Sequence, residues 1–273
     1  MDDIGVYEER RFPAFRNPTV DTLDLGKKKH HIPLLFEVDV TEARSYMRDF
    51  KAQTGESLSF TGWVIKCIGQ AVGEHKHIQA MRKGRSRLIL FDDVDVSIVV
   101  ERAVGHNEGA SETLPMPYIV RRANTKTVQA INDEIRAAQT ASLGSGEVQL
   151  GARRNAYLTK AFTFMPRFLR NVLVWRRLIT DPLFAKKAMG TVVVTSIGSS
   201  GHYSGYGWAV PIGIHPLVFA LGSIAKKPGV VDDAIAIREY LSMTVLFDHS
   251  QTYNNSKFYL NFSDVLKLQL PVD

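Results

Sequence analysis

The chain has 273 residues, of which 45% are hydrophobic, so it can bury a core as one large domain or two small ones. A single cysteine, Cys67, excludes an internal disulfide and fits a reducing compartment. The start of the chain has no basic stretch followed by an apolar one, and no run of ~18 apolar residues occurs, so we expect neither a signal peptide nor a membrane-spanning helix. The composition favours a cytoplasmic protein.

The net charge of +6 is concentrated in one segment. Residues 151–190 hold nine lysines and arginines against one aspartate, a net charge of +8, so the remaining residues sum to −2. A protein that binds nucleic acid usually carries a broad basic face. We therefore expect no nucleic-acid partner, and a local role for this one segment.

The first half of the chain alternates strand-like and helix-like patterns. In chain order, the predicted elements are a strand at 34–40, helices at 41–51 and 61–75, strands at 87–91, 94–104 and 117–120, and a helix at 124–139. Thr41 is the expected N-cap of the first helix. Asp92 and Asp93 are expected in a turn, and with Asp95 they form either a carboxylate cluster or an ordinary entry into a strand.

After the basic segment, the second half is dominated by strand-like runs. The predicted elements are a strand at 191–198, a glycine-rich loop at 199–208, strand-like runs at 209–213, 217–225 and 234–247, and a helix at 255–268. The loop lacks the pattern of a phosphate-binding loop, so it is either structural or a place of close approach to a ligand. Strands and helices mix without strict alternation. The sequence therefore predicts an α/β fold of the α+β type, a mixed sheet with helices packed mainly on one face.

Histidines are the main candidates for chemistry. His249 follows Asp248 directly after a strand-like run, and it is either a catalytic base or an ordinary histidine at a strand end. His75 and His77 have no third ligand at useful spacing, and one cysteine cannot build a thiolate site, so we expect no metal. The run LGKKKHHIP at 25–33 is predicted to be a solvated basic loop.

Three segments together resemble one family. They are GTVVVTSIGSSG from Gly190, AVPIGIHPLVFALGSI at 209–224 and FDHSQTYNNS at 247–256. In this order they resemble the catalytic domain of dihydrolipoamide acyltransferases, the core subunits of 2-oxo acid dehydrogenase complexes. The resemblance covers about 8–270 except for the basic segment. It implies the fold of chloramphenicol acetyltransferase and a homotrimer with active sites between subunits, with a larger cage left open.

The resemblance also implies a chemistry. In the family, the motif histidine is a general base on a thiol, which attacks a thioester, and a hydroxyl from the neighbouring subunit stabilises the oxyanion. The base corresponds to His249 and the hydroxyl to Thr195, with Ser196 beside it as the fallback. Coenzyme A or its acyl thioester is then a substrate, and the expected function is acyl transfer.

The histidine motif departs from the family pattern. Tyr253 stands where the family has aspartate or asparagine, Asn254 where it has glycine, and Ser250 where it has arginine. A neutral tyrosine must change either the positioning of the imidazole or the access of substrate. The alternative function is therefore a catalytically silent oligomeric scaffold or binding subunit.

One catalytic domain over residues 1–273 is expected, with no lipoyl domain, no lipoyl group and no subunit-binding domain. An insertion at about 151–189 contains an amphipathic helix. Phe168, Leu169, Val172, Leu173, Trp175 and Ile179 are predicted on one side of it, and Arg167, Arg170, Asn171 and Arg177 on another. Several interpretations stay open: a packed helix with a solvated basic face, a helix that caps a pocket or forms a subunit contact, contact with an anionic membrane surface that makes the protein peripheral, or contact with an acidic partner.

Overall fold

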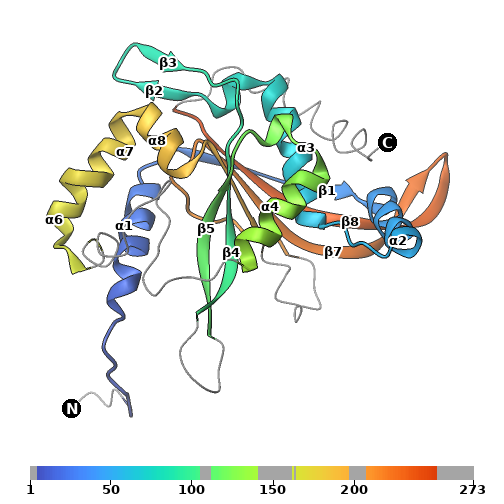
Figure 1. Cartoon of the computed structure of the whole chain (residues 1–273), viewed down its shortest axis with the longest axis horizontal. Coiled ribbons are helices and arrows are strands. Elements are labelled where there is room, and N and C mark those ends of the chain that lie inside the picture. Colours follow the sequence, from blue (N-terminus) through green and yellow to red (C-terminus); the bar gives the residue numbers. More distant parts are fainter. Residues whose placement is uncertain (1–4, 105–111, 141–161, 163, 197–206, 251–273) are drawn as a thin grey trace.

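A six-stranded mixed sheet forms the centre of the computed structural model (Figure 1), which describes all residues except 1–4, 105–111, 141–161, 163, 197–206 and 251–273. Its strand order is β1-β8-β7-β6-β4-β5. The strands are β1 (His31–Asp39), β4 (Val96–Val104), β5 (Glu112–Val120), β6 (Val192–Ser196), β7 (Leu217–Val231) and β8 (Ala234–Asp248). β6 runs parallel to β4 and β7, and the other pairs are antiparallel. A separate hairpin joins β2 (Met81–Lys83) to β3 (Arg87–Ile89).

Helices cover one face of this sheet. They include α2 (Thr41–Thr54), α3 (Phe60–Glu74) and α4 (Val128–Thr140), with short 3-10 turns η2 (Lys76–Gln79) and η3 (Ala123–Thr125). Side chains of α3, such as Trp63 and Ile68, share one buried cluster with Phe219 of β7 and Phe247 of β8. Alternate residues of a strand point to the same face, so the odd-numbered residues of β7 and β8 near their paired ends face α3. This layering confirms the predicted fold class.

The insertion forms a compact set of helices beside the N-terminal region, seen at the left of Figure 1. It consists of α6 (Arg167–Arg170), a π-helical turn η4 (Asn171–Trp175), α7 (Arg176–Thr180) and α8 (Pro182–Met189). These lie next to α1 (Asn17–Gly26), which follows η1 (Ala14–Arg16). A second buried cluster joins Trp175, Leu178 and Ala185 of the insertion to Met81, Phe91 and Ile214. These helices therefore share an apolar core with residues outside the segment 151–189.

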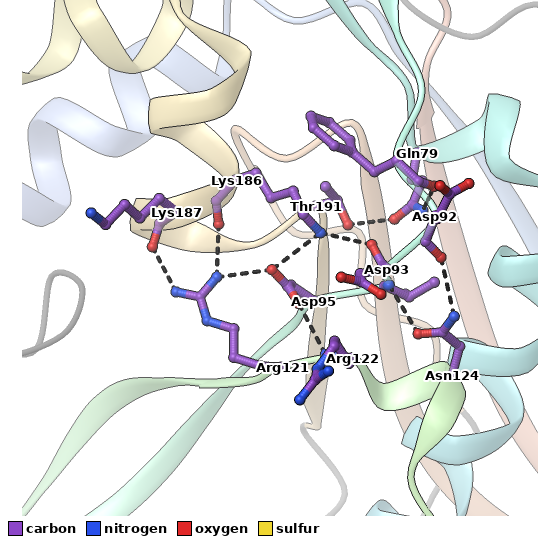
Figure 2. A network of polar contacts seen from close by, with 12 residues as sticks. Gln79, Asp92, Asp93, Asp95, Arg121, Arg122, Asn124, Lys186, Lys187 and Thr191 are labelled. Carbon is purple, nitrogen blue, oxygen red and sulfur yellow. Dashed lines mark hydrogen bonds and ion pairs between the residues drawn. The ribbon is translucent and has the colours of Figure 1, made fainter.

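A polar network fixes the end of the insertion to the sheet, as Figure 2 shows. The guanidinium of Arg121 donates to Asp95 Oδ2 at 2.9 Å and to the carbonyl oxygens of Lys186 and Lys187. The backbone N–H of Thr191 donates to the carbonyl of Asp95 at 3.0 Å. Gly190 has a φ of 77°, and a Cβ there would lie 2.6 Å from that carbonyl. Glycine is thus required where α8 gives way to β6.

Most predicted elements are confirmed, and two expectations are not. Thr41 does not cap α2 with its side chain; instead Asp39 Oδ1 accepts from the backbone N–H of Thr41 at 3.0 Å and from its hydroxyl at 2.6 Å. The run AVPIG at 209–213 forms no strand, and Pro211 within it has no N–H to donate to a ladder. α1 and β2 were not predicted. The expected helix at 255–268 lies outside the described residues.

Candidate functional site

The turn that carries His249 begins where β8 ends, and backbone hydrogen bonds hold it on both sides. The N–H of Asp248 donates to the carbonyl of Pro216 at 2.9 Å, and the N–H of His249 donates to the carbonyl of His30 at 2.9 Å. The side chain of Asp248 is buried, whereas His249 is exposed. The segments that contain His30 and Pro216 therefore fix the backbone of His249, while its side chain is exposed.

Asp248 is the anchor of this turn. Its Oδ2 lies 3.0 Å from the ammonium of Lys29, and its Oδ1 accepts from the hydroxyl of Ser250 at 2.6 Å and from the N–H of Ser250 at 3.2 Å. Burial alone would raise the pKa of the carboxyl, but the hydrogen bonds from Ser250 and the charge of Lys29 outweigh it, so the pKa of Asp248 lies below its usual value. Asp248 is an anion at neutral pH.

Two further histidines lie next to this ion pair. His31 Nε2 is 2.9 Å from the carbonyl oxygen of His215, and His215 Nε2 is 2.9 Å from the carbonyl oxygen of Met189. Burial, together with the charge of Lys29 and with His31, lowers the pKa of His215 to about 4, against a smaller raising effect of its bond to Met189. His215 is therefore neutral at pH 7 and donates from Nε2.

These contacts correct the prediction that 25–33 is a solvated basic loop. Lys29 and His31 are only partly exposed and contact Asp248 and His215. Sequence reasoning missed both as residues of the site. Pairing of β1 with β8 brings them there, because His31 is opposite Asp248 in the register, and nothing in the local pattern of 25–33 indicates that pairing.

Thr195 and Ser196 end strand β6 and point to opposite faces of the sheet. Thr195 is partly buried on the face away from α3, and Ser196 is exposed. Thr195 is opposite Ala220, and Ala220 is opposite Thr244. His249 lies five residues beyond Thr244, a separation of ~17 Å along the strand direction, with two strand spacings of ~4.8 Å across it. One chain therefore does not bring Thr195 and His249 together.

Thr244 is a further polar group on the face that Thr195 occupies. Its hydroxyl is buried and has no hydrogen-bond partner within the part of the chain that the structure describes. In the register, Ala220 lies between Thr195 and Thr244 on the neighbouring strands. Its short side chain leaves the two hydroxyls on one strip of this face. Buried hydroxyls are normally paired, so this strip is a place where a polar group from outside the described residues would be stabilised.

The remaining predicted residues receive no structural test. Tyr253 and Asn254 lie outside the described residues. Within the described ranges, no cluster of three or more histidine, cysteine, aspartate or glutamate side chains could hold a metal ion. The same ranges contain no helix long and apolar enough to cross a membrane.

The structure agrees only in part with the interpretation of a packed apolar side and a solvated basic side: Trp175 is buried and Arg167 and Arg177 are exposed, as that interpretation requires, but other residues depart from it. Arg170 is buried and donates from Nε to Asp21 Oδ2 at 2.7 Å, and Trp175 Nε1 donates to the same oxygen at 3.0 Å. Phe168, Val172 and Leu173, in contrast, are exposed. Asp21 of α1 attracts the arginine inward, which the sequence of the helix alone cannot show.

Comparison with known proteins identifies the family. A model of the 2-oxoacid dehydrogenases acyltransferase (catalytic domain) matches residues 6–146, about half of the chain. The chain belongs to this acyltransferase family. The matched residues include α1 to α4 and β1 to β5, and they end before β6 and β8, on which Thr195 and His249 depend.

Curated relatives extend the similarity past the matched segment. The acetyltransferase components of the pyruvate dehydrogenase complexes of Staphylococcus epidermidis and Staphylococcus aureus, named dihydrolipoyllysine-residue acetyltransferases, are each 24% identical to this acyltransferase, over 250 and 249 residues. The alignments cover 88% of this chain and 46% of each relative. The chain thus spans about half the length of the relatives it matches.

Solved structures share the fold. A dihydrolipoamide acetyltransferase of Azotobacter vinelandii matches with a TM-score of 0.67 and 14% identity, over 97% of this chain and 93% of that one. A probable dihydrolipoamide acetyltransferase of Listeria monocytogenes matches with a TM-score of 0.62 and 19% identity, over 96% and 94%. The cubic core of a pyruvate dehydrogenase complex matches with a TM-score of 0.65 and 14% identity, over 97% and 93%. The chain therefore has the fold of these catalytic cores.

Proposed function

We propose that this chain is a coenzyme A-dependent acyltransferase whose active site forms between two subunits of a homotrimer. His249 is the general base, and Thr195 of the neighbouring subunit donates to the oxyanion. The observation that carries the proposal is the placement of His249: an exposed imidazole on a turn held by Asp248 and Lys29, in a chain of an acyltransferase family.

The chemistry follows from the groups available. The imidazole of His249 accepts the proton of the acceptor thiol, whose ordinary pKa is about 8.5, so that a thiolate forms near neutral pH. The thiolate attacks the thioester carbonyl, and a tetrahedral oxyanion develops. A hydroxyl in place stabilises this oxyanion by a hydrogen bond, and removal of such a donor costs about 10²–10³ in rate. Collapse of the intermediate expels the second thiolate, which takes the proton back from the imidazolium.

The separation of Thr195 from His249 favours a site shared between subunits. Within one chain the two residues are ~17 Å apart along the strands alone. A hydroxyl must lie ~2.7–3.1 Å from the oxyanion to stabilise it. A second copy of the chain would supply the hydroxyl donor. This agrees with the similarity between the fold of this chain and that of an assembled core.

Thiol release from a panel of acyl-coenzyme A donors tests the proposal, with small thiols, amines and alcohols as acceptors. Wild type is expected to release coenzyme A faster than His249→Ala with at least one donor and acceptor pair. His77→Gln, at a histidine of η2 outside the proposed site, is the matched control and is expected to keep the wild-type rate. Equal background rates for wild type and His249→Ala across the panel would contradict acyl transfer.

The second candidate function is a silent oligomeric scaffold, and the sequence after His249 favours it. Work on the Azotobacter vinelandii enzyme addressed a serine, a histidine and, four residues after the histidine, an asparagine in its catalytic mechanism. Tyr253 stands at that spacing here. Tyr253→Asn distinguishes the two functions: appearance of thiol release in this variant, with none in wild type, would assign the wild-type chain to the scaffold.

A further inference from the structure

Residues 167–180 form one continuous helix from α6 through η4 to α7, which buries Trp175 and Leu178 and exposes a second set of apolar side chains. At the measured rise of an α-helix it is ~21 Å long. We define the outer apolar face by the exposed apolar side chains of this helix and of the first turn of α8: Phe168, Leu169, Val172, Leu173, Ile179 and Leu183. Phe168 is 67% exposed, and Val172 and Leu173 are 58% and 57% exposed. Phe168 and Val172 are four residues apart, and so are Leu169 and Leu173. Side chains at this spacing lie on one side of a helix, so these four form a single stripe.

Buried contacts between the opposite side of the helix and Asp21 of α1 fix the orientation of this stripe. Asp21 Oδ2 accepts from Arg170 Nε at 2.7 Å and from the indole N–H of Trp175 at 3.0 Å, and all three side chains are buried. Arg170 also donates to the carbonyl of Met165. A rotation that buried Phe168 would have to expose Trp175 and separate the buried ion pair of Arg170 and Asp21, which is strongly destabilising. The outer apolar face is therefore a built feature and not a loosely attached helix.

Cations accompany the apolar side chains. Arg176 is exposed and follows Val172 and Leu173 by one helical turn, so it lies within the stripe. Arg177 and Lys187 are exposed beside it, and the guanidinium of Arg177 lies 4.4 Å from the ring centroid of Phe184. Arg170 and Lys186 are occupied by Asp21 and Asp95. Three cations, Arg176, Arg177 and Lys187, remain at the surface. Asp181, partly exposed and 3.9 Å from Arg177, balances one of these charges.

We propose that the outer apolar face docks on an anionic lipid bilayer and makes this acyltransferase a peripheral membrane protein. Apolar side chains that enter the boundary of head groups and acyl chains, with arginines at the level of the head groups, are the chemistry of an interfacial helix. A long arginine side chain can place its stem in that boundary and its charge in the head groups. A helix of ~21 Å is too short to cross ~30 Å of hydrocarbon, so the contact is on the surface.

Vesicle co-sedimentation tests the proposal with the full chain and without any acyl donor, so that it does not depend on the proposed function. Vesicles of 70% phosphatidylcholine and 30% phosphatidylserine are compared with pure phosphatidylcholine. Wild type is expected to bind the anionic vesicles, and more weakly the neutral ones. Val172→Ser/Leu173→Ser is expected to lower the partition coefficient at least ~10-fold, because several buried methyl and methylene groups are lost at ~0.8 kcal/mol each. Arg176→Gln is expected to lower binding to the anionic vesicles alone.

Leu88→Ser/Leu90→Ser is the matched control, because these residues are also exposed and apolar and lie on and next to β3. It is expected to bind vesicles as wild type does, and near-ultraviolet circular dichroism checks the fold of each variant. Absence of wild-type binding to anionic vesicles would overturn the proposal. Light scattering gives a second such outcome: a loss of assembly mass in Val172→Ser/Leu173→Ser, with unchanged vesicle binding, would assign the face to a subunit contact instead.

Discussion

Lys29 and Asp248 form an ion pair of 3.0 Å in which the carboxylate is completely buried and the ammonium largely so. Lys29 lies just after α1, and Asp248 is the last residue of β8. The pair joins the two ends of the chain directly beneath the backbone of His249. The same contact therefore stabilises the fold and holds the turn that carries the proposed base, His249.

Lys29→Met is expected to destabilise the protein by about 3 kcal/mol, because it removes the cation that lies 3.0 Å from a buried carboxylate. Urea denaturation followed by circular dichroism measures the free energy of unfolding. Lys27→Met is the matched control: Lys27 is 66% exposed and 3.9 Å from Asp24, and such surface pairs contribute ~0–1 kcal/mol. Equal losses in the two variants would mean that the Lys29 pair contributes no more than a surface contact.

His215 predicts a fall in stability on mild acidification. Burial holds its pKa at about 4, below the ~6.5 expected in the unfolded chain. Between these values the unfolded chain binds a proton that the native protein does not, so the free energy of unfolding decreases as the pH is lowered from about 6.5 to 4, by at most ~1.4 kcal/mol per pH unit. The pKa of Asp248 is lowered from a value near 4, so its contribution is lost only below this window.

His215→Gln removes this titration and keeps a donor for the carbonyl of Met189. Its free energy of unfolding is expected to vary less between pH 6.5 and 4 than that of wild type, measured by urea denaturation at several pH values. His30→Gln replaces an exposed histidine and serves as the control. A profile for His215→Gln that parallels the wild-type profile would show that another group causes the pH dependence.

Thr195 is expected to contribute through its hydroxyl and not its methyl group. Thr195→Ser should keep kcat for acyl transfer within a few-fold, whereas Thr195→Val should lower it by about 10²–10³ with little change in KM. Steady-state kinetics with one acyl-coenzyme A donor separates kcat from KM. If Ser196→Ala shows the loss and Thr195→Val does not, Ser196 is the donor.

A shared site predicts complementation between inactive chains. His249→Ala and Thr195→Val are each expected to be inactive, but their co-expression should restore activity, because some interfaces combine an intact histidine with an intact threonine. Random mixing of equal amounts restores about a quarter of the sites. No recovery in mixed trimers, with light scattering confirming that they form, would exclude a site made from two chains.

Arg170 is buried, so it is expected to stabilise the fold of the insertion and to contribute little to the charge of its surface. Arg170→Met should cost about 3 kcal/mol, because it removes the buried cation from Asp21 and leaves the more exposed Arg167, 3.4 Å away, and the indole N–H of Trp175 as partners. Asp21→Asn/Arg170→Met should be less destabilised than the sum of the single variants, measured by urea denaturation. Simple additivity in this double-mutant cycle would show that the two side chains do not interact.

Local patterns were sufficient for the elements whose neighbours are close in sequence. The apolar spacing at 61–75 gave α3 because these side chains are buried under the sheet, and the two long strands β7 and β8 were predicted from composition together with a turn that contains Asp232 and Asp233. AVPIG has the composition of a strand but no strand beside it to pair with. Hydrophobic pattern predicts that a run is buried, and it does not predict its hydrogen-bond partner.

The site was less predictable because its contacts join distant residues. The Asp-His pair was visible in the sequence, and its place at the end of β8 is confirmed. The partners of Asp248 and of Arg170, namely Lys29 and Asp21, come from segments that showed no functional pattern of their own. A helix pattern reports which side chains share a side and not which of them contact the rest of the protein, so it did not predict the burial of Arg170 against Asp21 or the exposure of Phe168 and Val172.

The second buried cluster has a practical consequence for protein engineering. Trp175, Leu178 and Ala185 cover Met81, Phe91 and Ile214, which lie outside the segment 151–189. A shortened version made by cutting out 162–189 would uncover those apolar side chains together with the carboxylate of Asp21. These helices are thus not a removable appendage; a shortened chain would need replacement residues at each of these uncovered positions.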